Sequence, residues 1–285
     1  MITITGATGA LNGRTVEHLL QSVDPSELAV VVRDPARAER FAARGVAVRR
    51  GDYADPDGLR SAFEGADRLL LVSSNDRGVD AVALHAAAVR AAASAGVGHV
   101  LYTSHQGSHE ASPFAPARDH AATEALLADS GLRWTALRNG FYSHALEWML
   151  GPWRETGVVS VPADGPVSWT SREDAAEAAA LLLQREELPD GPVTLTASDA
   201  PSFADLARWA GEAAHREVGF EVIDEEEWLQ RAIANGQPAG AARFTLGVFQ
   251  AAAGGFFAGI DPALRDILGR EPATAESVVR SFARD

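Results

Sequence analysis

The sequence contains neither cysteine nor lysine among its 285 residues. The absence of cysteine excludes disulfide bonds, thiol nucleophiles and cysteine-ligated zinc. Because all 25 basic residues are arginine, Schiff-base chemistry and any proton relay that depends on lysine are excluded as well. No stretch approaches the roughly 20 apolar residues that a membrane-spanning helix needs, so we expect no membrane partner.

Positive charge is also scarce, with 25 basic against 39 acidic residues and a net charge of −14. Such a surface repels phosphate backbones, so a nucleic-acid partner is not expected. Hydrophobic residues make up 46% of the chain, which allows one large domain or a core domain with a smaller lobe. Because a strand is expected from Ile2 onward, we expect no signal peptide and a cytoplasmic enzyme.

The first thirteen residues carry the most informative pattern of the chain. Ile2–Thr5 is β-branched throughout and predicts a short buried strand, after which Gly6 and Gly9 turn the chain. From Leu11 onward, apolar residues recur at helical spacing. Glycines let the backbone approach a pyrophosphate, and the free N–H groups at a helix start point at its charge. The pattern predicts a dinucleotide turn, with an ordinary strand-to-helix turn as the alternative.

One position departs from the dinucleotide fingerprint, which places a third small residue where the helix packs closely on the strand. That position is Asn12, and the next glycine is Gly13. Either the helix lies slightly further from the strand, or the turn is shifted in register.

Buried strands and helices then alternate along the first half of the chain, as in a doubly wound α/β fold with a parallel sheet. The alternation fades after residue 140, where an aromatic-rich connection begins. We expect the strands to lie at Leu28–Val32, Val46–Gly51, Arg68–Val72, His99–Thr103 and Arg133–Arg138.

Charged residues follow two of these strands. In this fold the end of the second strand meets the adenosine ribose, and an acidic residue there would favour NAD. Arg33 instead predicts the 2′-phosphate of NADP, with Arg37 as a second contact. The alternative is two solvated arginines in a loop, and Asp34 keeps NAD as the less favoured cofactor.

Asp52, after the third strand, either accepts from the adenine amine or caps the following turn. His85 lies within the expected helix after the fourth strand and is read as structural.

Together, these strand ends resemble the NmrA-like branch of the atypical short-chain dehydrogenases, close to its bacterial NADPH:quinone oxidoreductases and triphenylmethane reductases. The resemblance covers almost the whole chain. Its motifs are the glycine turn, Arg33-Asp34-Pro35, Gly51-Asp52-Tyr53, Tyr102-Thr103-Ser104, Leu137 to Tyr142, and Leu268 to Pro272.

The resemblance implies a Rossmann-like NADP-binding core over residues 1–150, with later returns of the chain to the sheet. Residues 151–285 would then form mainly a small α/β substrate lobe. It also implies a set of cofactor contacts. The pyrophosphate turn would use Gly6, Thr8, Gly9, Ala10 and Leu11, the 2′-phosphate Arg33 and Arg37, the adenine Asp52 and Tyr53, the nicotinamide ribose Ser73 and Ser74, and the nicotinamide Tyr102, Thr103 and Ser104.

Catalytic residues are expected after the fifth strand, where many short-chain dehydrogenases carry Tyr and Lys four residues apart on one helix face. The corresponding positions here are His120 and Glu124. We expect His120 to orient the acceptor or supply a proton, with Glu124 and Tyr102 beside it. The alternative is an exposed helical pair that contributes little.

Hydride transfer to a small aromatic or quinone acceptor is therefore the leading activity, with no metal involved. Phe141, Tyr142 and Trp148 are the candidate acceptor-binding residues, although such aromatics are more often plain core. Two alternatives stay open, namely a regulator that binds NADP without turnover and a reductase that tailors a polycyclic metabolite. The assembly is also open, with a homodimer as one possibility.

Overall fold

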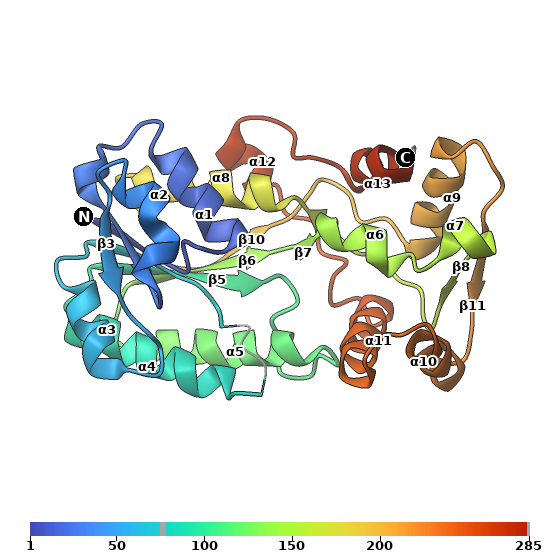
Figure 1. Cartoon of the computed structure of the whole chain (residues 1–285), viewed down its shortest axis with the longest axis horizontal. Helices are drawn as coiled ribbons and strands as arrows, with labels where there is room; N and C mark the ends of the chain where they lie inside the picture. Colours follow the sequence, from blue (N-terminus) through green and yellow to red (C-terminus); the bar gives the residue numbers. More distant parts are fainter. Residues whose placement is uncertain (75–77, 284–285) are drawn as a thin grey trace. The chain divides into compact units, whose positions relative to one another are not determined.

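The computed structural model describes residues 1–74 and 78–283, which form two compact units interleaved along the chain (Figure 1). The first unit comprises Met1–His105, Asp119–Arg138 and Arg172–Thr194. The second comprises Gln106–Arg118, Asn139–Ser171 and Leu195–Asp285. The expected division of function at residue 150 stays a prediction.

The first unit is built on a seven-stranded sheet with the order β10-β6-β5-β4-β1-β2-β3. The pairs β1–β2, β2–β3, β1–β4 and β4–β5 are all parallel. The strand order reverses between β1 and β4, and ligands of such sheets bind beyond the carboxyl ends of the strands at this point. The strands are β1 (Ile2–Thr5), β2 (Leu28–Val32), β3 (Ala47–Arg50), β4 (Arg68–Leu71), β5 (His99–His105), β6 (Trp134–Asn139) and β10 (Gly191–Leu195).

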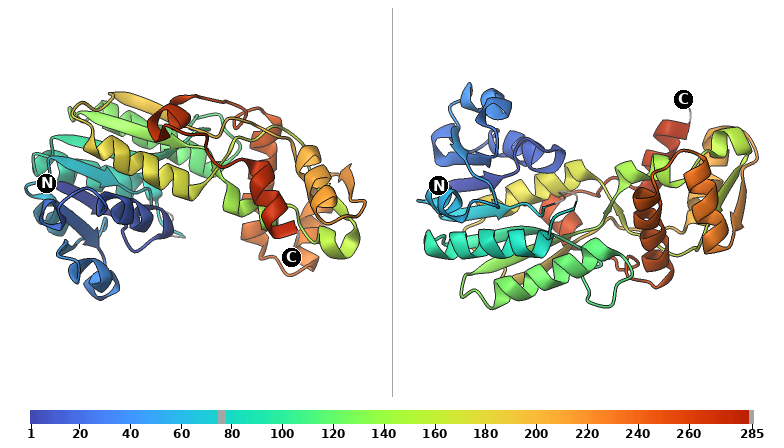
Figure 2. Two further views of the ribbon diagram at one scale, coloured as in Figure 1. Left: turned by 90° about the horizontal axis from the view of Figure 1, so that it is seen from above. Right: turned by 60° about the horizontal axis from the view of Figure 1, so that its bottom comes forward.

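Helices cover both faces of this sheet, as Figures 1 and 2 show. Helices α1 and α8 pack together on one face, while α3 and α4 pack together on the other. Aspartates define several starts, because Asp55 and Asp80 each accept a backbone N–H at the first turn of their helix. The helices are α1 (Ala10–Leu19), α2 (Glu39–Ala42), α3 (Pro56–Phe63), α4 (Ala81–Ser94), α5 (Ala115–Ala128) and α8 (Arg172–Gln184), with 3-10 turns η1 (Pro25–Glu27) and η2 (Pro35–Ala38).

The second unit combines small parallel strand pairs with short helices. Its strands pair as β7 (Phe141–Tyr142) with β9 (Trp169–Thr170), and as β8 (Val158–Val161) with β11 (Gly219–Val222). Its core is rich in aromatic side chains, including the fully buried Trp153 and Trp169. The helices are η3 (Ser143–Ala145), α6 (Leu146–Met149), α7 (Trp153–Thr156), α9 (Phe203–Ala213), α10 (Glu225–Ala234), α11 (Ala239–Ala253), α12 (Ala263–Leu268) and α13 (Ala275–Ala283).

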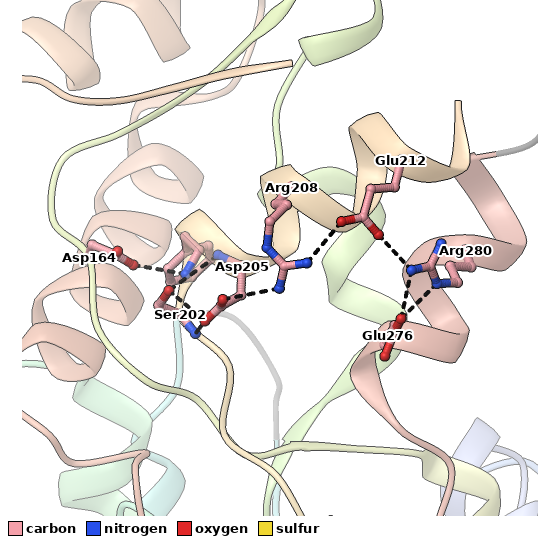
Figure 3. A network of polar contacts seen from close by, with 8 residues as sticks. Asp164, Ser202, Asp205, Arg208, Glu212, Glu276 and Arg280 are labelled. Atoms are coloured by element: carbon pink, nitrogen blue, oxygen red, sulfur yellow. Dashed lines mark hydrogen bonds and ion pairs between the residues drawn. The ribbon is translucent and has the colours of Figure 1, made fainter. Parts of the chain in front are cut away.

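Polar contacts tie α9 to its neighbours within this unit (Figure 3). Ser202 and Asp205 form a capping box at the start of α9. At the other end of the helix, Glu212 accepts from Arg208 at 2.9 Å and from Arg280 of α13 at 2.7 Å. The contact between Glu212 and Arg280 joins α9 to α13. Helix α9 begins at Phe203 because the side chain of Ser202 caps its first turn.

The structure confirms the predicted fold class, a doubly wound parallel sheet with a smaller α/β unit. The expected strands lie within a residue or two of their observed positions. The Gly-, Ala- and Phe-rich stretch from Gly236 to Gly259 is mainly the single helix α11. The short helices α2, α3, α6 and α7 were not expected, because four to eight residues carry too little periodicity to identify them.

Candidate functional site

The glycine turn lies between the carboxyl end of β1 and the start of α1. Gly6 has a left-handed backbone with φ of +63°, and a Cβ atom added there would lie 2.6 Å from Cγ1 of Val72. Both the conformation and the close approach to the end of β4 require glycine. Gly9 is the N-cap of α1, and within the residues that the structure describes no side chain caps this helix. The first N–H groups of α1 therefore have no side-chain acceptor at the exposed residues Gly9 and Ala10, which suits a pyrophosphate.

Asn12 and Gly13 make separate contacts with this turn. A Cβ on Gly13 would lie 2.9 Å from the carbonyl oxygen of Ala7, so Gly13 provides the close packing between helix and turn. Asn12 is buried, and its side-chain amide donates to the carbonyl of Thr5 at 2.8 Å.

Three arginines lie on the β2 side of this turn. Arg33 and Arg37 are exposed. Asp34 caps the 3-10 turn η2 by accepting from the N–H of Ala36 at 3.1 Å, so its carboxylate has a structural role. Arg40 was not singled out from the sequence, yet its guanidinium lies beside Gly13, 2.7 Å from where a Cβ would stand. The guanidinium carbon of Arg40 lies 4.5 Å from the centroid of the Phe41 ring, as a cation–π pair. Arg40 has no anionic partner among the described residues.

Asp52 and Tyr53 follow β3. The carboxylate of Asp52 accepts from the N–H of Ala54 at 3.0 Å, which is the turn-capping alternative. The Tyr53 hydroxyl donates to the carbonyl of Val72 at 2.8 Å and lies 2.8 Å from the hydroxyl of Thr5. Tyr53 therefore joins the carboxyl ends of β1 and β4, and burial raises the pKa of its phenol above the ordinary value.

Ser73 and Ser74 follow β4 and are each held from a neighbouring element. The N–H of Ser73 donates to the hydroxyl of Thr103 on β5 at 2.8 Å. The N–H of Ser74 donates to Nε2 of His85 on α4 at 2.7 Å. The residues after β4 are therefore held to both β5 and α4. They follow Val72, on which Gly6 of the glycine turn packs.

Tyr102 and His120 form a hydrogen-bonded pair next to this turn. The Tyr102 hydroxyl lies 2.9 Å from Nδ1 of His120, and the ring of His105 stacks on that of His120 with centroids 6.2 Å apart. Burial raises the pKa of Tyr102, lowers that of His105 to about 4, and lowers that of His120 well below its ordinary value, helped by His105 and His85. The pair is therefore uncharged at neutral pH.

Glu124 lies one turn beyond His120 and is buried. Its two carboxylate oxygens share the N–H at Nε of Arg138, at 3.0 and 3.2 Å, and Nη2 of Arg138 donates to one of them. The hydroxyl of Ser104 also donates to this carboxylate, at 2.6 Å. The two residues are therefore not an exposed pair, because Glu124 is engaged by β5 and β6 rather than by solvent. This arrangement fixes Ser104 at the end of β5.

The acceptor-binding candidates belong to the second unit. Phe141 is buried among aromatic rings, with Phe114, Trp169 and Phe257 at centroid distances of 5.4 to 5.9 Å. The Tyr142 hydroxyl accepts from the amide of Asn139 at 3.2 Å, and Trp148 is 47% exposed. Phe141 thus has the packing of a core residue, and the acceptor role of all three side chains stays a prediction.

Within the described residues, no cluster of histidine and carboxylate side chains has the spacing of a metal site. No helix in residues 1–74 and 78–283 is long and apolar enough to cross a membrane.

Sequence reasoning did not predict which residues hold the strand ends and helices together. His85, whose Nε2 accepts from the N–H of Ser74, was assigned a structural role because a lone helical histidine gives no pattern. Thr123, whose hydroxyl lies 2.8 Å from Nδ1 of His85, gave no signal at all. Arg138 stood within a quoted motif, but only the fold brings it to Glu124. A charged residue inside a buried strand was the available signal, since such a residue needs a partner.

These features define a dinucleotide-binding protein: the glycine turn, the start of α1 without a side-chain cap among the described residues, and the strand ends around them. A family model described as NAD(P)H-binding matches residues 6–186, and the chain belongs to this family.

Relatives of known name span the whole length. The chain is 34% identical to quinone oxidoreductase 2 of Escherichia coli, over 99% of both chains, and 31% identical to an NmrA-like oxidoreductase of Aspergillus flavus, over 98% of this chain and 94% of the other. The crystal structure of the E. coli protein with NADPH has a TM-score of 0.91 and covers 99% of both chains, at 32% identity. That of Citrobacter triphenylmethane reductase with NADP(H) has a TM-score of 0.90, at 30% identity over 99% of both chains. The expected family resemblance is confirmed.

Proposed function

We propose that this protein is an NADPH-dependent oxidoreductase that transfers hydride to quinones or similar conjugated aromatic acceptors. One observation carries the proposal, namely the geometry of the glycine turn at the start of α1. Gly6 has a left-handed backbone, Gly13 packs closely on the turn, and among the described residues no side chain caps the helix. Relatives over the full length that are named for quinone and triphenylmethane reduction support the choice of acceptor.

The residues of the first unit fit the cofactor. The pyrophosphate would lie on the turn formed by Gly6, Thr8, Gly9, Ala10 and Leu11, where glycine leaves room for backbone approach. Exposed Arg33 and Arg37, together with Arg40, supply positive charge for the 2′-phosphate, so NADPH is preferred over NADH. Asp52 and Tyr53 border the adenine side, while Ser73, Ser74, Thr103 and Ser104 border the nicotinamide side.

Bound NADPH supplies the hydride, and the side chains of this chain prepare the acceptor. Tyr102 and His120 form an uncharged pair that donates a hydrogen bond to the oxygen or nitrogen on which negative charge develops. With no lysine in the chain, this pair is a weak acid, which is sufficient because quinones and cationic dyes are strong electrophiles. Glu124 holds Ser104 and Arg138 in place, and Phe141, Tyr142 and Trp148 are the acceptor-binding candidates of the second unit.

Several finer features belong to the same proposal. The chain would be an atypical short-chain dehydrogenase that acts in the cytoplasm, with residues 1–150 mainly binding cofactor and 151–285 mainly binding acceptor. The net charge of −14 supports the absence of a nucleic-acid partner. A homodimer is one candidate for its assembly.

The test is NADPH consumption by the purified protein across a panel of quinones, triphenylmethane dyes and enones. Rapid oxidation with simple benzoquinones is the expected result. NADPH binding by calorimetry without turnover of any acceptor would instead identify a sensor, and turnover with large polycyclic acceptors alone would identify a tailoring reductase.

A further inference from the structure

His85 joins two elements of the first unit from the centre of a buried cluster. The side chain is 1% exposed on α4. Its Nε2 lies 2.7 Å from the backbone nitrogen of Ser74, in the turn after β4. Its Nδ1 lies 2.8 Å from the hydroxyl of Thr123 on α5, the helix that carries His120.

The partners of the ring fix the direction of both hydrogen bonds. The N–H of Ser74 can only donate, so Nε2 of His85 accepts. The Thr123 hydroxyl donates its hydrogen to the carbonyl of Asp119 at 2.7 Å, so it accepts from His85. The imidazole is therefore neutral, with its hydrogen on Nδ1.

The surroundings agree with a neutral ring. Burial lowers the pKa of His85 to about 4, and the nearby Asp80 only partly opposes this shift. The other ionisable groups that face the ring are Tyr102, whose pKa is raised, and His120, whose pKa is lowered. Tyr102 and His120 are therefore uncharged at neutral pH, as His85 is.

The tautomer also decides what Tyr102 can do. Its hydroxyl lies 3.5 Å from Nδ1 of His85, and the two rings meet edge to face with centroids 5.5 Å apart. Because Nδ1 carries a hydrogen, it offers no lone pair to the phenol. His85 thus cannot take the phenolic proton, whereas His120 lies 2.9 Å from the same hydroxyl.

We propose that His85 is a positioning residue of the reductase site, which fixes the Ser74 backbone to the helix that carries His120. The proposal rests on the proposed function, in which Ser74 borders the cofactor and His120 the acceptor. His85 itself touches neither, and acts through Ser74, Thr123 and Tyr102.

The first test is spectroscopic and needs no activity. Nitrogen-15 NMR of the imidazole rings in the full chain should show His85 as a neutral ring protonated at Nδ1, without titration between about pH 5.5 and 8. A ring protonated at Nε2, or one that titrates near its ordinary pKa, would overturn the proposal.

The second test compares two variants at this position. His85→Phe retains an aromatic ring but leaves the Ser74 N–H unpaired, and should weaken NADPH binding about ten-fold and lower kcat. His85→Gln places an amide oxygen where Nε2 stood, and should restore both values to within about three-fold of the wild type. His99→Gln is the matched control, because His99 is equally buried in β5 and bonds Thr135 instead.

The outcomes separate the two proposals. If His85→Phe folds, binds NADPH and turns over a quinone as the wild type does, His85 is not a positioning residue. If His85→Gln is as impaired as His85→Phe, packing rather than the hydrogen bonds is responsible, which also contradicts the proposal. If the wild type shows the expected tautomer yet binds no NADPH, the proposed function fails instead.

Discussion

The side-chain amide of Asn12 donates a hydrogen bond to the backbone carbonyl of Thr5, with 2.8 Å between the two atoms. The bond runs from the first turn of α1 to the last residue of β1, and therefore spans the glycine turn. Asn12 is 1% exposed and stands where the dinucleotide fingerprint has its third small residue. Its role is to hold the turn together, while Gly13 takes over the close approach.

Asn12→Gly should therefore lower the stability of the protein without harming its cofactor site. The buried Thr5 carbonyl loses its side-chain donor and the helix gains a glycine, which together cost about 1–3 kcal/mol of unfolding free energy. The Kd for NADPH should stay within about three-fold of the wild type. Chemical denaturation and calorimetry check the two quantities. A variant that binds NADPH where the wild type does not would contradict the assignment of the site.

Cofactor selectivity is expected to depend on exposed arginines. A guanidinium–phosphate pair contributes about 1.5–3 kcal/mol, so Arg33→Ala should weaken NADPH binding about ten-fold or more and NADH binding little. Arg40→Ala should act in the same direction, because its guanidinium lies beside Gly13. Arg90→Ala, an exposed arginine on α4, is the control. Equal losses for both cofactors in calorimetry would remove the arginines from the 2′-phosphate site.

Glu124 is expected to contribute more to stability than the surface carboxylates do. Glu124→Gln leaves the partly buried Arg138 without its anion, at a cost of about 2–3 kcal/mol in unfolding free energy. Glu64→Gln is the matched control, since the Arg60–Glu64 pair is exposed and should cost less than about 0.5 kcal/mol. Similar losses in the two variants, measured by urea denaturation, would show that burial adds nothing to the Glu124 pair.

The sequence predicted the features that depend on residues close together in the chain. Alternating buried strands and the glycine turn predicted the sheet. His120 and Glu124 were correctly placed on one helix, but their partners come from β5 and β6, and strand order cannot be read from local periodicity. The contacts of His85 were not predicted for the same reason, because Ser74 and Thr123 approach it only in the folded protein. The separate contacts of Asn12 and Gly13 depended on packing distances that no pattern encodes.

Stability should fall as the solution is acidified from about pH 6.5 to 5. His85, His99 and His105 each have a pKa of about 4 in the folded protein, against about 6.5 when unfolded. Below the unfolded value, the unfolded chain binds protons that the folded chain does not. Each histidine therefore lowers the unfolding free energy by up to about 1.4 kcal/mol per pH unit. Denaturation midpoints at a series of pH values measure this slope, which should be shallower in His99→Gln. A midpoint that does not move between pH 7 and 5 would show that these rings are hydrated in the folded state.

The final prediction concerns the proton that follows the hydride. Because Tyr102 and His120 are an uncharged pair and the chain has no lysine, acid catalysis should be weak. His120→Ala should then lower kcat with a quinone by about 10²-fold or less, at the low end of what general acids contribute. Simple ketones, which demand strong proton transfer, should be poor substrates of the wild type. Since the pKa of His120 is lowered well below its ordinary value, its imidazole is neutral at neutral pH, and kcat with a quinone should show no inflection from His120 around neutral pH. A paired assay of wild type and His120→Ala with a benzoquinone and an aliphatic ketone checks both points, with Tyr102→Phe as a second removal of the same hydrogen bond. Efficient ketone reduction by the wild type that disappears in His120→Ala would show that a strong proton relay operates in this site.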